Sequence, residues 1–363
     1  MDLILKSNSL CFLCFSGDQM ADYEDDVTVS EEELSDSSPS NSNSEDAVEP
    51  STENSEETED GSPEFSGQEW AAPEPRDTCS LFTAQPQWAF VEIGDPNDWR
   101  IHIPAENERI CSDCGADKFG VYEYVFKEMG LRLPFSDFQM SVLNHLDLAP
   151  SQLHPNSFAF IRAFELTCEY LNIGATLPLF FNVFHLQRQA VQGKFGWVSL
   201  KQVRKLFKAF SESIRTFKNR YFFVEPMSAR AEEYVYTWEV EKDDRGRPVL
   251  DEHGEVVKSQ LLKFRFSWSN EHFQRKSDDY VTNPSLMSEE DQESYRVLTN
   301  FVDSFVPAQR VTRAKKLVFE EDGSPAVVPR YICCAQLLAC PSHEEAMKLL
   351  GIYFTYARYD FIY

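Results

Sequence analysis

The sequence lacks positive charge near its start. Residues 7–75 contain 20 Asp and Glu and no Lys or Arg, a net charge of −20, whereas residues 76–363 have a net charge of −6. The stretch 21–66 is rich in serine and almost free of aromatic residues. Such a composition cannot bury enough apolar surface to offset its conformational entropy. We therefore expect residues 1–85 to be a long disordered acidic arm that acts as a spacer or, alternatively, is phosphorylated or binds basic partners.

The sequence also lacks a membrane span and a disulfide framework. No apolar run approaches the roughly 18 residues that a membrane helix needs, and the nine cysteines are odd in number and scattered. This pattern favours an intracellular protein, in the nucleus or the cytoplasm, without membrane contact. Cys111 and Cys114 form a CxxC pair, but no further ligands follow at zinc-site spacing. We interpret them as an incidental thiol pair rather than a metal or redox site.

No catalytic constellation stands out. Paired carboxylates, a nucleophile with its base, and a phosphate-binding loop are not recognisable in the sequence. His145, His154 and His185 lie near aromatic residues, and we interpret them as packed or surface histidines. The sequence thus predicts a protein that is not an enzyme, with no catalytic or metal-binding residues, no cofactor and no small-molecule substrate.

The clearest structural signal is a pair of capped helices within residues 133–170. Ser136 and Gln139 have the spacing of a capping box, and Pro155 suits the first position of the second helix. The second helix places apolar residues at three- and four-residue steps: Phe158, Ile161, Phe164, Cys168 and Leu171. This periodicity predicts a face that packs into a core. We expect the pair to be a packing scaffold rather than a reaction centre.

The remaining patterns predict further helices at 118–130, 177–189, 200–210, 288–302 and 341–350, and strands at 88–93, 99–104, 195–200, 220–225, 234–241 and 261–268. Two tight turns, DDRGRP and DEHG, are expected between the last two strands. The predicted fold class is α+β, with a helical N-terminal half followed by a small antiparallel sheet. The predicted domains are the arm (1–85), a domain (86–310) that is helical to about 190 and β-rich from about 195, and a C-terminal extension (311–363) of undefined order.

Residues 148–165, LAPSQLHPNSFAFIRAFE, resemble the signature turn of the plant transposon protein domain, a gag-like family of gypsy-type retrotransposons. The similarity extends over about 121–226 and includes GWV at 196–198 and FKNRYFFV at 217–224. The resemblance implies a transposon-derived, gag-like domain without catalytic residues. The chain has no CxxC-xxxx-H-xxxx-C zinc knuckle, and Asp77-Thr78 is followed by Cys79 rather than by the glycine of an aspartic-protease DTG.

A basic cluster lies between 194 and 220. Its candidate nucleic-acid-binding residues are Lys201, Arg204, Lys205, Lys208, Arg215, Lys218 and Arg220, with Lys194 beside them. On a helix over 200–210 the bases would face solvent, and Tyr221 to Phe223 would lie nearby to stack on nucleotide bases. Alternatively, the cations pair with acids elsewhere on the fold. The predicted function is protein–protein interaction or self-association, and the alternative is RNA or DNA binding through residues 194–220.

Overall fold

The computed structural model describes residues 70–359, except 189–194, 212, 215, 272–274 and 313–315. The described residues fall into two compact units. The larger unit comprises the described residues up to Pro307 and those from Pro329 onward, and the smaller unit comprises those of Ala308–Val328. Most of the predicted acidic arm, residues 1–69, lies outside the described part of the chain.

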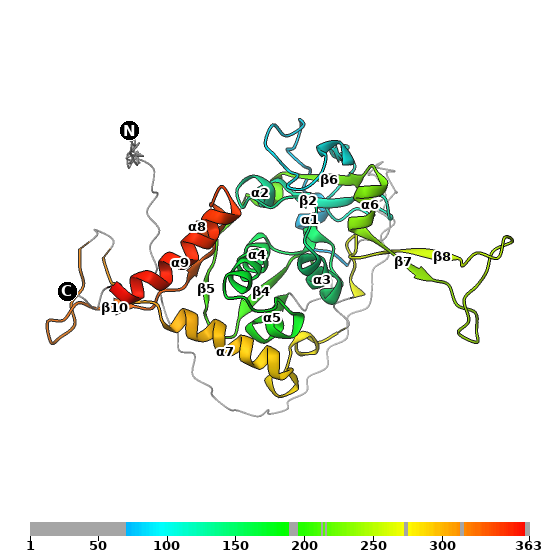
Figure 1. Cartoon of the computed structure of the whole chain (residues 1–363). Coiled ribbons are helices and arrows are strands. Elements are labelled where there is room, and N and C mark those ends of the chain that lie inside the picture. Colours follow the sequence, from blue (N-terminus) through cyan, green and yellow to red (C-terminus); the bar gives the residue numbers. More distant parts are fainter. Residues whose placement is uncertain are drawn as a thin grey trace, which may run out of the picture. The chain divides into compact units, whose positions relative to one another are not determined.

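A three-stranded antiparallel sheet forms one side of the larger unit (Figure 1). Its order is β1 (Trp99–His102), β6 (Tyr221–Pro226) and β2 (Phe119–Tyr122). The central strand β6 begins with four buried residues, as expected for aromatic and β-branched side chains with neighbours on both sides. In β2, a Cβ on Gly120 would lie 3.0 Å from Ile110 Cδ1 and 3.4 Å from Ser151 Oγ. Glycine therefore allows the turn that carries Ser151 to pack directly on this strand.

The predicted helix pair is confirmed as α3 (Asp137–Leu146) and α4 (Pro155–Tyr170), joined by the 3-10 turn η2 (Pro150–Gln152). The Ser136 hydroxyl accepts a hydrogen bond from the Gln139 amide, and the Gln139 side chain accepts one from the Ser136 amide, which closes the capping box. Pro155 is the first residue of α4. In Figure 1, α4 lies between α3, α5 and β4, and it also contacts α8 and α9. The helix therefore forms the centre of the core.

The other elements complete this arrangement. Those of the larger unit are α1 (Pro73–Asp77), η1 (Pro96–Asp98), α2 (Glu123–Lys127), α5 (Leu177–Val183), β3 (Phe184–Arg188), β4 (Val198–Gln202), β5 (Phe207–Lys208), η3 (Phe217–Asn219), α6 (Ala229–Val235), β7 (Tyr236–Val240), β8 (Lys258–Leu262), η5 (Ser277–Tyr280), η6 (Pro284–Leu286), α7 (Glu289–Asp303), β11 (Ile332–Cys333), α8 (Cys334–Leu338) and α9 (His343–Tyr359). Strands β3 and β4 pair antiparallel, as do β7 and β8, whereas β5 and β11 pair in parallel. The smaller unit contains the antiparallel pair β9 (Ala308–Gln309) and β10 (Val327–Val328).

The α+β class is confirmed, but the prediction of a helical N-terminal half is wrong. Strands β1 and β2 precede the helix pair and complete their sheet with β6, which follows about a hundred residues later. The predicted helix at 118–130 is strand β2 followed by α2, and the one at 177–189 is α5 followed by β3. Short apolar runs that are buried on both faces cannot be assigned to helix or strand from periodicity alone. Whether such a run forms a strand depends on the strand that pairs with it.

Of the remaining predictions, some are confirmed and others are wrong. The strand at 220–225 is confirmed as β6, and the helix at 288–302 as α7, whose N-cap is Ser288. The segment 88–93 forms no strand and makes a single bridge between Val91 and Leu133. The predicted helix at 200–210 is instead the end of β4, a bend and β5. Among the described residues, no helix combines the length and apolarity that crossing a membrane requires.

Candidate interaction surfaces

The signature turn around η2 is a packing hub. Ser151 and Gln152 are buried, at 1% and 0% exposure. The Ser151 hydroxyl accepts a hydrogen bond of 2.7 Å from the indole N–H of Trp268. The Gln152 amide donates to the Ser269 carbonyl at 3.0 Å, and its oxygen accepts from the Ala149 amide at 3.2 Å. Because these polar groups are satisfied by the chain itself, the turn holds the segment 268–269 against the helix pair and presents no free reactive group.

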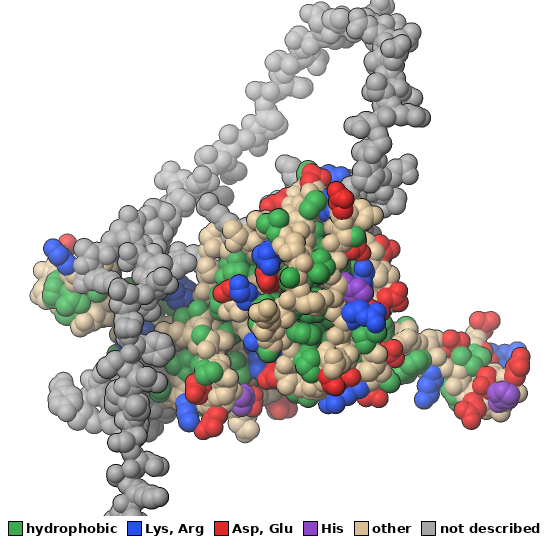
Figure 2. All heavy atoms as spheres, turned by 90° about the horizontal axis from the view of Figure 1, so that it is seen from above, with side chains coloured by type: hydrophobic (Ala, Val, Ile, Leu, Met, Phe, Trp, Pro, Cys, Tyr) green, Lys and Arg blue, Asp and Glu red, His purple; other side chains and the backbone are tan. Residues whose placement is uncertain are grey.

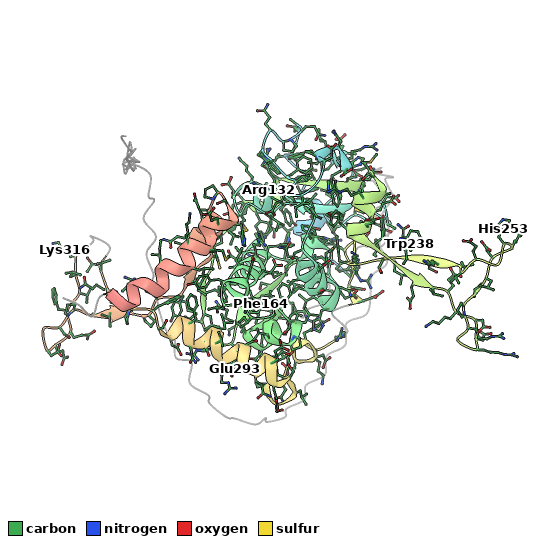
Figure 3. All side chains as sticks on the ribbon, viewed as in Figure 1. Arg132, Phe164, Trp238, His253, Glu293 and Lys316 are labelled. Atoms are coloured by element: carbon green, nitrogen blue, oxygen red, sulfur yellow. The ribbon has the colours of Figure 1, made fainter. Side chains whose placement is uncertain are left out.

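A partly buried carboxylate lies beside the same helix pair. Glu165 on α4 accepts hydrogen bonds from the Ser136 hydroxyl and, at 2.8 Å, from the side-chain amide of Gln139. Burial raises the pKa of Glu165 above its ordinary value, against the opposing effect of these hydrogen bonds and of Arg162. A carboxylate with this many donors ties α4 to the first turn of α3. The neighbouring residue Phe164 (Figure 3) also contacts α3, where its ring stacks on Phe138 at 5.6 Å between ring centroids.

The CxxC thiols are buried, not exposed. The Cys111 thiol donates a hydrogen bond to the Pro75 carbonyl, and the Cys114 thiol donates one to the Ser112 carbonyl, both at 3.4 Å. Burial raises the pKa of Cys111 to about 11 and that of Cys114 to about 12. Both thiols therefore stay protonated at neutral pH, and a protonated thiol is a poor nucleophile and metal ligand. No group of three or more metal-ligating side chains occurs among the described residues.

Two of the three histidines pack against aromatic rings. His145 lies 4.5 Å from the Phe181 ring and 5.8 Å from that of Tyr280, measured between centroids, and burial lowers its pKa. His154 is the N-cap of α4, where its Nδ1 accepts a hydrogen bond from the Asn156 amide. Burial, reinforced by the nearby charge of Lys218, lowers the pKa of His154 to about 4. These neutral rings serve the packing of the core.

The basic cluster is distributed over several elements instead of one helix face. Lys201 is on β4, Lys208 on β5 and Lys218 on η3, while Arg204, Lys205 and Arg220 lie in connecting segments. Lys194 and Arg215 lie outside the described residues. The aromatic residues Tyr221 to Phe223, expected to stack on nucleotide bases, are fully buried in the sheet and cannot do so. The cluster therefore lacks the aromatic platform that the sequence indicated.

Half of the described cations in this cluster are paired with acids. Arg204 forms an ion pair with Asp303 at 2.5 Å, Lys218 with Glu74 at 2.6 Å, and Arg220 with Glu123. The Lys218 ammonium also lies 4.1 Å from the centre of the Trp197 ring. Lys201, Lys205 and Lys208 are exposed and make no ion pair with another described residue, although Lys205 lies 4.7 Å from the centre of the Tyr331 ring. Three lysines remain available to a phosphate backbone.

A hairpin arm, residues 236–262, projects from the rest of the larger unit (Figure 1). At its outer end three backbone segments meet in a closed ring of hydrogen bonds. Glu241 N–H donates to Val257 O at 3.0 Å, Val257 N–H to Val249 O at 2.9 Å, and Val249 N–H to Glu241 O at 2.8 Å. Two small lobes leave this ring, bridged at Lys242–Pro248 and Leu250–Val256. Their ends are the predicted tight turns, closed by Gly246 N–H to Asp243 O and Gly254 N–H to Asp251 O.

The hairpin arm exposes a tryptophan. Trp238 on β7 is 59% exposed, and Leu250, Val256 and Leu261 of the same arm are also exposed. A hollow of about 520 Å³ is lined by Trp238, Glu255, Val256 and Lys258. Figure 2 shows hydrophobic side chains of the arm, at the right, among acidic and basic ones, and Figure 3 places Trp238 on the arm with His253 at its tip. The sequence signals a strand here, but an alternating strand pattern does not reveal that both faces remain in solvent.

Comparison with known protein families relates part of the chain to transposons. Residues 121–188 match a family model described as "Putative gypsy type transposon". No curated protein and no solved structure matches the chain. The matched segment runs from β2 through the helix pair to β3. The resemblance predicted from the sequence is thus confirmed as a relationship to gypsy-type transposons, and the hairpin arm lies outside the matched segment.

Proposed function

Because residues 121–188 are related to gypsy-type transposons, we propose that this chain is a non-enzymatic, gag-like domain that binds a second copy of itself through the hairpin arm. The observation that carries this proposal is the 59% exposure of Trp238. Every other tryptophan and phenylalanine of the larger unit whose side-chain exposure the structure describes is buried or half-buried. A single large aromatic side chain left in solvent on a projecting element is typical of a contact residue.

The construction of the arm supports a contact role. Among the described strands, β7 and β8 pair only with each other, so both outer edges of this two-stranded sheet are unpaired. A two-stranded hairpin is marginally stable in water by itself, and free edges offer backbone donors and acceptors to another chain. Covering Trp238 and Leu261 with a partner would remove apolar surface from water and satisfy an edge at the same time. Binding therefore stabilises the arm as well as the complex.

The charges beside Trp238 favour a protein partner over a polyanion. The hollow is lined by Glu255 and Lys258, one acid and one base. A phosphate backbone would be attracted by Lys258 and repelled by Glu255. A second copy of this chain presents apolar residues flanked by both signs of charge, as this site requires. Self-association is accordingly the form of protein interaction proposed.

The absence of a catalytic role is part of the same proposal. The partly buried carboxylate of Glu165 accepts hydrogen bonds from Ser136 and Gln139, and burial keeps the thiols of Cys111 and Cys114 protonated. A carboxylate with a raised pKa and a pair of neighbouring thiols are among the groups of the described core that a reaction could use. Each is engaged in packing or hydrogen bonding within the fold. This supports a scaffold rather than a reaction centre.

The alternative function, RNA or DNA binding, rests on the three exposed lysines. Lys201, Lys205 and Lys208 lie on or between β4 and β5. If all three contact phosphates of a single strand, log Kobs should fall against log salt with a slope of about −2. Filter binding of the full chain to a single-stranded oligonucleotide at several salt concentrations tests this. Lack of affinity at low salt would remove the alternative.

Sedimentation of the full chain over a range of concentrations tests the main proposal. We expect the wild type to associate and Trp238→Ala to weaken association by about 30-fold or more, the effect of removing a central aromatic contact. Leu286→Ser is the matched control, because Leu286 is 82% exposed on η6 and lies outside the arm. A wild type that stays monomeric at all concentrations, or a Trp238→Ala chain that associates like the control, contradicts the proposal.

A further inference from the structure

The smaller unit repeats the outer end of the hairpin arm. Its three backbone segments close a second ring of hydrogen bonds: Arg310 N–H to Ala326 O at 2.7 Å, Ala326 N–H to Val318 O at 2.8 Å, and Val318 N–H to Arg310 O at 3.0 Å. Two lobes leave this ring as well, bridged at Val311–Leu317 and Phe319–Pro325. Each of these positions lies 69 residues after its counterpart in the hairpin arm. We call residues 241–257 the first junction and residues 310–326 the second junction.

The sequences of the two junctions agree where the geometry is the same. Residues 249–254 read VLDEHG and residues 318–323 read VFEEDG. Gly254 and Gly323 occupy the same position and have φ values of +79° and +83°. Other side chains rarely adopt this conformation, so glycine is required in both turns. The chain therefore contains the same small β-structure twice, once in each compact unit.

The second junction exposes an aromatic residue at an equivalent position. Phe319 occupies the place of Leu250 and is 57% exposed. Trp238 and Phe319 are the two exposed Trp or Phe side chains among the residues whose side-chain exposure the structure describes. Phe319 is followed by Glu320, and Lys316 precedes it in the same junction; both are exposed. The second junction thus carries an exposed aromatic ring with an exposed base and an exposed acid close to it in the sequence.

This pattern complements the hollow of the hairpin arm. The hollow has an apolar lining of Trp238 and Val256 with Glu255 and Lys258 beside it. We infer that Phe319 of one copy inserts into this hollow of another copy, with Lys316 and Glu320 facing Glu255 and Lys258, respectively. Aromatic rings pack well edge-to-face, and opposite charges on both sides fix the orientation. This inference rests on the proposed self-association and names the two surfaces that meet.

A contact between two identical hollows is less favourable. Two concave surfaces of about 520 Å³ each, placed face to face, would enclose a space that no side chain fills. Protein interfaces are packed as densely as protein interiors, so such a void costs contact energy on both sides. A phenylalanine ring placed in the hollow covers Trp238 and Val256 instead. The contact is therefore heterologous, and copies join head to tail into rings or open chains.

Complementation between two variants tests this geometry with the full chain. Trp238→Ala removes the acceptor and keeps Phe319, whereas Phe319→Ser removes the exposed ring and keeps the hollow. We expect each variant alone to associate about 30-fold or more weakly than the wild type, and an equimolar mixture to form a dimer that grows no further. Leu286→Ser again serves as the exposed apolar control.

The outcomes separate this inference from the proposed function. Loss of association in Trp238→Ala together with wild-type association in Phe319→Ser would overturn the head-to-tail contact and leave self-association through the arm intact. A monomeric wild type overturns both. Charge reversal gives a second test that does not truncate either aromatic residue. Lys258→Glu and Glu320→Lys should each weaken association several-fold, and a chain with both changes should regain it; failure of the double variant to recover contradicts the inference.

Discussion

Replacing Gln152 with leucine should destabilise the fold without disturbing any surface. Gln152 is fully buried in the signature turn, and its side chain makes three hydrogen bonds: from the Ala149 amide, to the Ser269 carbonyl and from the Ser269 amide. Leucine has similar volume but satisfies none of these groups. Each buried backbone group left without a partner costs about 1–3 kcal/mol. Because Ser269 is only half-buried and its groups can reach water, the total should be about 3 kcal/mol.

Urea unfolding of the full chain, followed by circular dichroism, measures this cost. A loss of about 3 kcal/mol is large against the roughly 5–15 kcal/mol that stabilise a typical domain, so the midpoint should shift clearly. Gln87→Leu is the matched control, since Gln87 is exposed and the same change there should alter stability by less than about 0.5 kcal/mol. If Gln152→Leu costs less than about 1 kcal/mol, the turn is not the packing hub described above.

Gln152→Glu adds a check on the mechanism. The carboxylate keeps oxygen acceptors for the Ala149 and Ser269 amides but cannot donate to the Ser269 carbonyl, and it buries a charge. When protonated, the same side chain can donate again. The destabilisation relative to wild type should therefore shrink as the pH falls toward 4, provided that both chains are compared at each pH. A cost independent of pH would show that the donor to Ser269 contributes little.

Two further predictions concern ionisation in the core. Burial lowers the pKa of His154 from 6.5 to about 4, so between pH 6.5 and pH 4 the unfolded chain binds more protons than the folded one. The contribution of neutral His154 to folding stability is therefore complete above pH 6.5 and is lost as the pH falls toward 4. The loss should be about 2 kcal/mol after allowance for the partial exposure of the ring. His154→Asn keeps an acceptor for the N-cap and should flatten this pH dependence in urea titrations, and an unchanged slope would contradict the assignment. With pKa values raised to about 11 and 12, Cys111 and Cys114 should react with a thiol reagent at pH 7.5 far more slowly than in the unfolded chain. Equal rates in the two states, read by mass spectrometry, would refute burial of the pair.

The features predicted correctly from the sequence are those specified by local chemistry. The capping box of Ser136 and Gln139, the proline at the start of α4 and the serine cap of α7 each depend on residues within four positions of one another. Side-chain-to-backbone bonds of this range form in any tertiary context. Such features can therefore be predicted from the sequence alone.

The errors arose where pairing with another strand determined the structure. At Tyr122–Glu123 and at Val183–Phe184 a strand and a helix adjoin without glycine or proline between them. Strand β2 pairs with β6, about a hundred residues later, whereas β3 pairs with β4, the next strand along the chain. The apolar runs at 118–130 and 177–189 do not show by themselves that part of each run has such a partner. Tertiary pairing overrode the local preference for helix.

The basic cluster shows the same limit for a candidate site. Eight cations within 27 positions suggest a charged surface, but the acids that pair with Arg204, Lys218 and Arg220 lie 99, 144 and 97 residues away in sequence. The sequence allows these cations to pair with acids elsewhere on the fold, but it does not show which acids lie near them. Similarly, the burial of Tyr221 to Phe223 follows from their central place in the sheet, which requires strands from two other parts of the chain.

The repeated junction was missed for a different physical reason. Its ring is built from backbone donors and acceptors alone, so the side chains around it are free to differ between the copies. The structure requires only glycine at positions 254 and 323, where φ is positive, and lobes long enough for the backbone to come back to the ring. Six matching or similar residues in seventeen do not stand out in a sequence of 363. Because the ring depends on backbone hydrogen bonds alone, the side chains of the two junctions can differ. The first junction can therefore contribute to a hollow while the second presents an exposed phenylalanine, and a head-to-tail contact needs two such different surfaces.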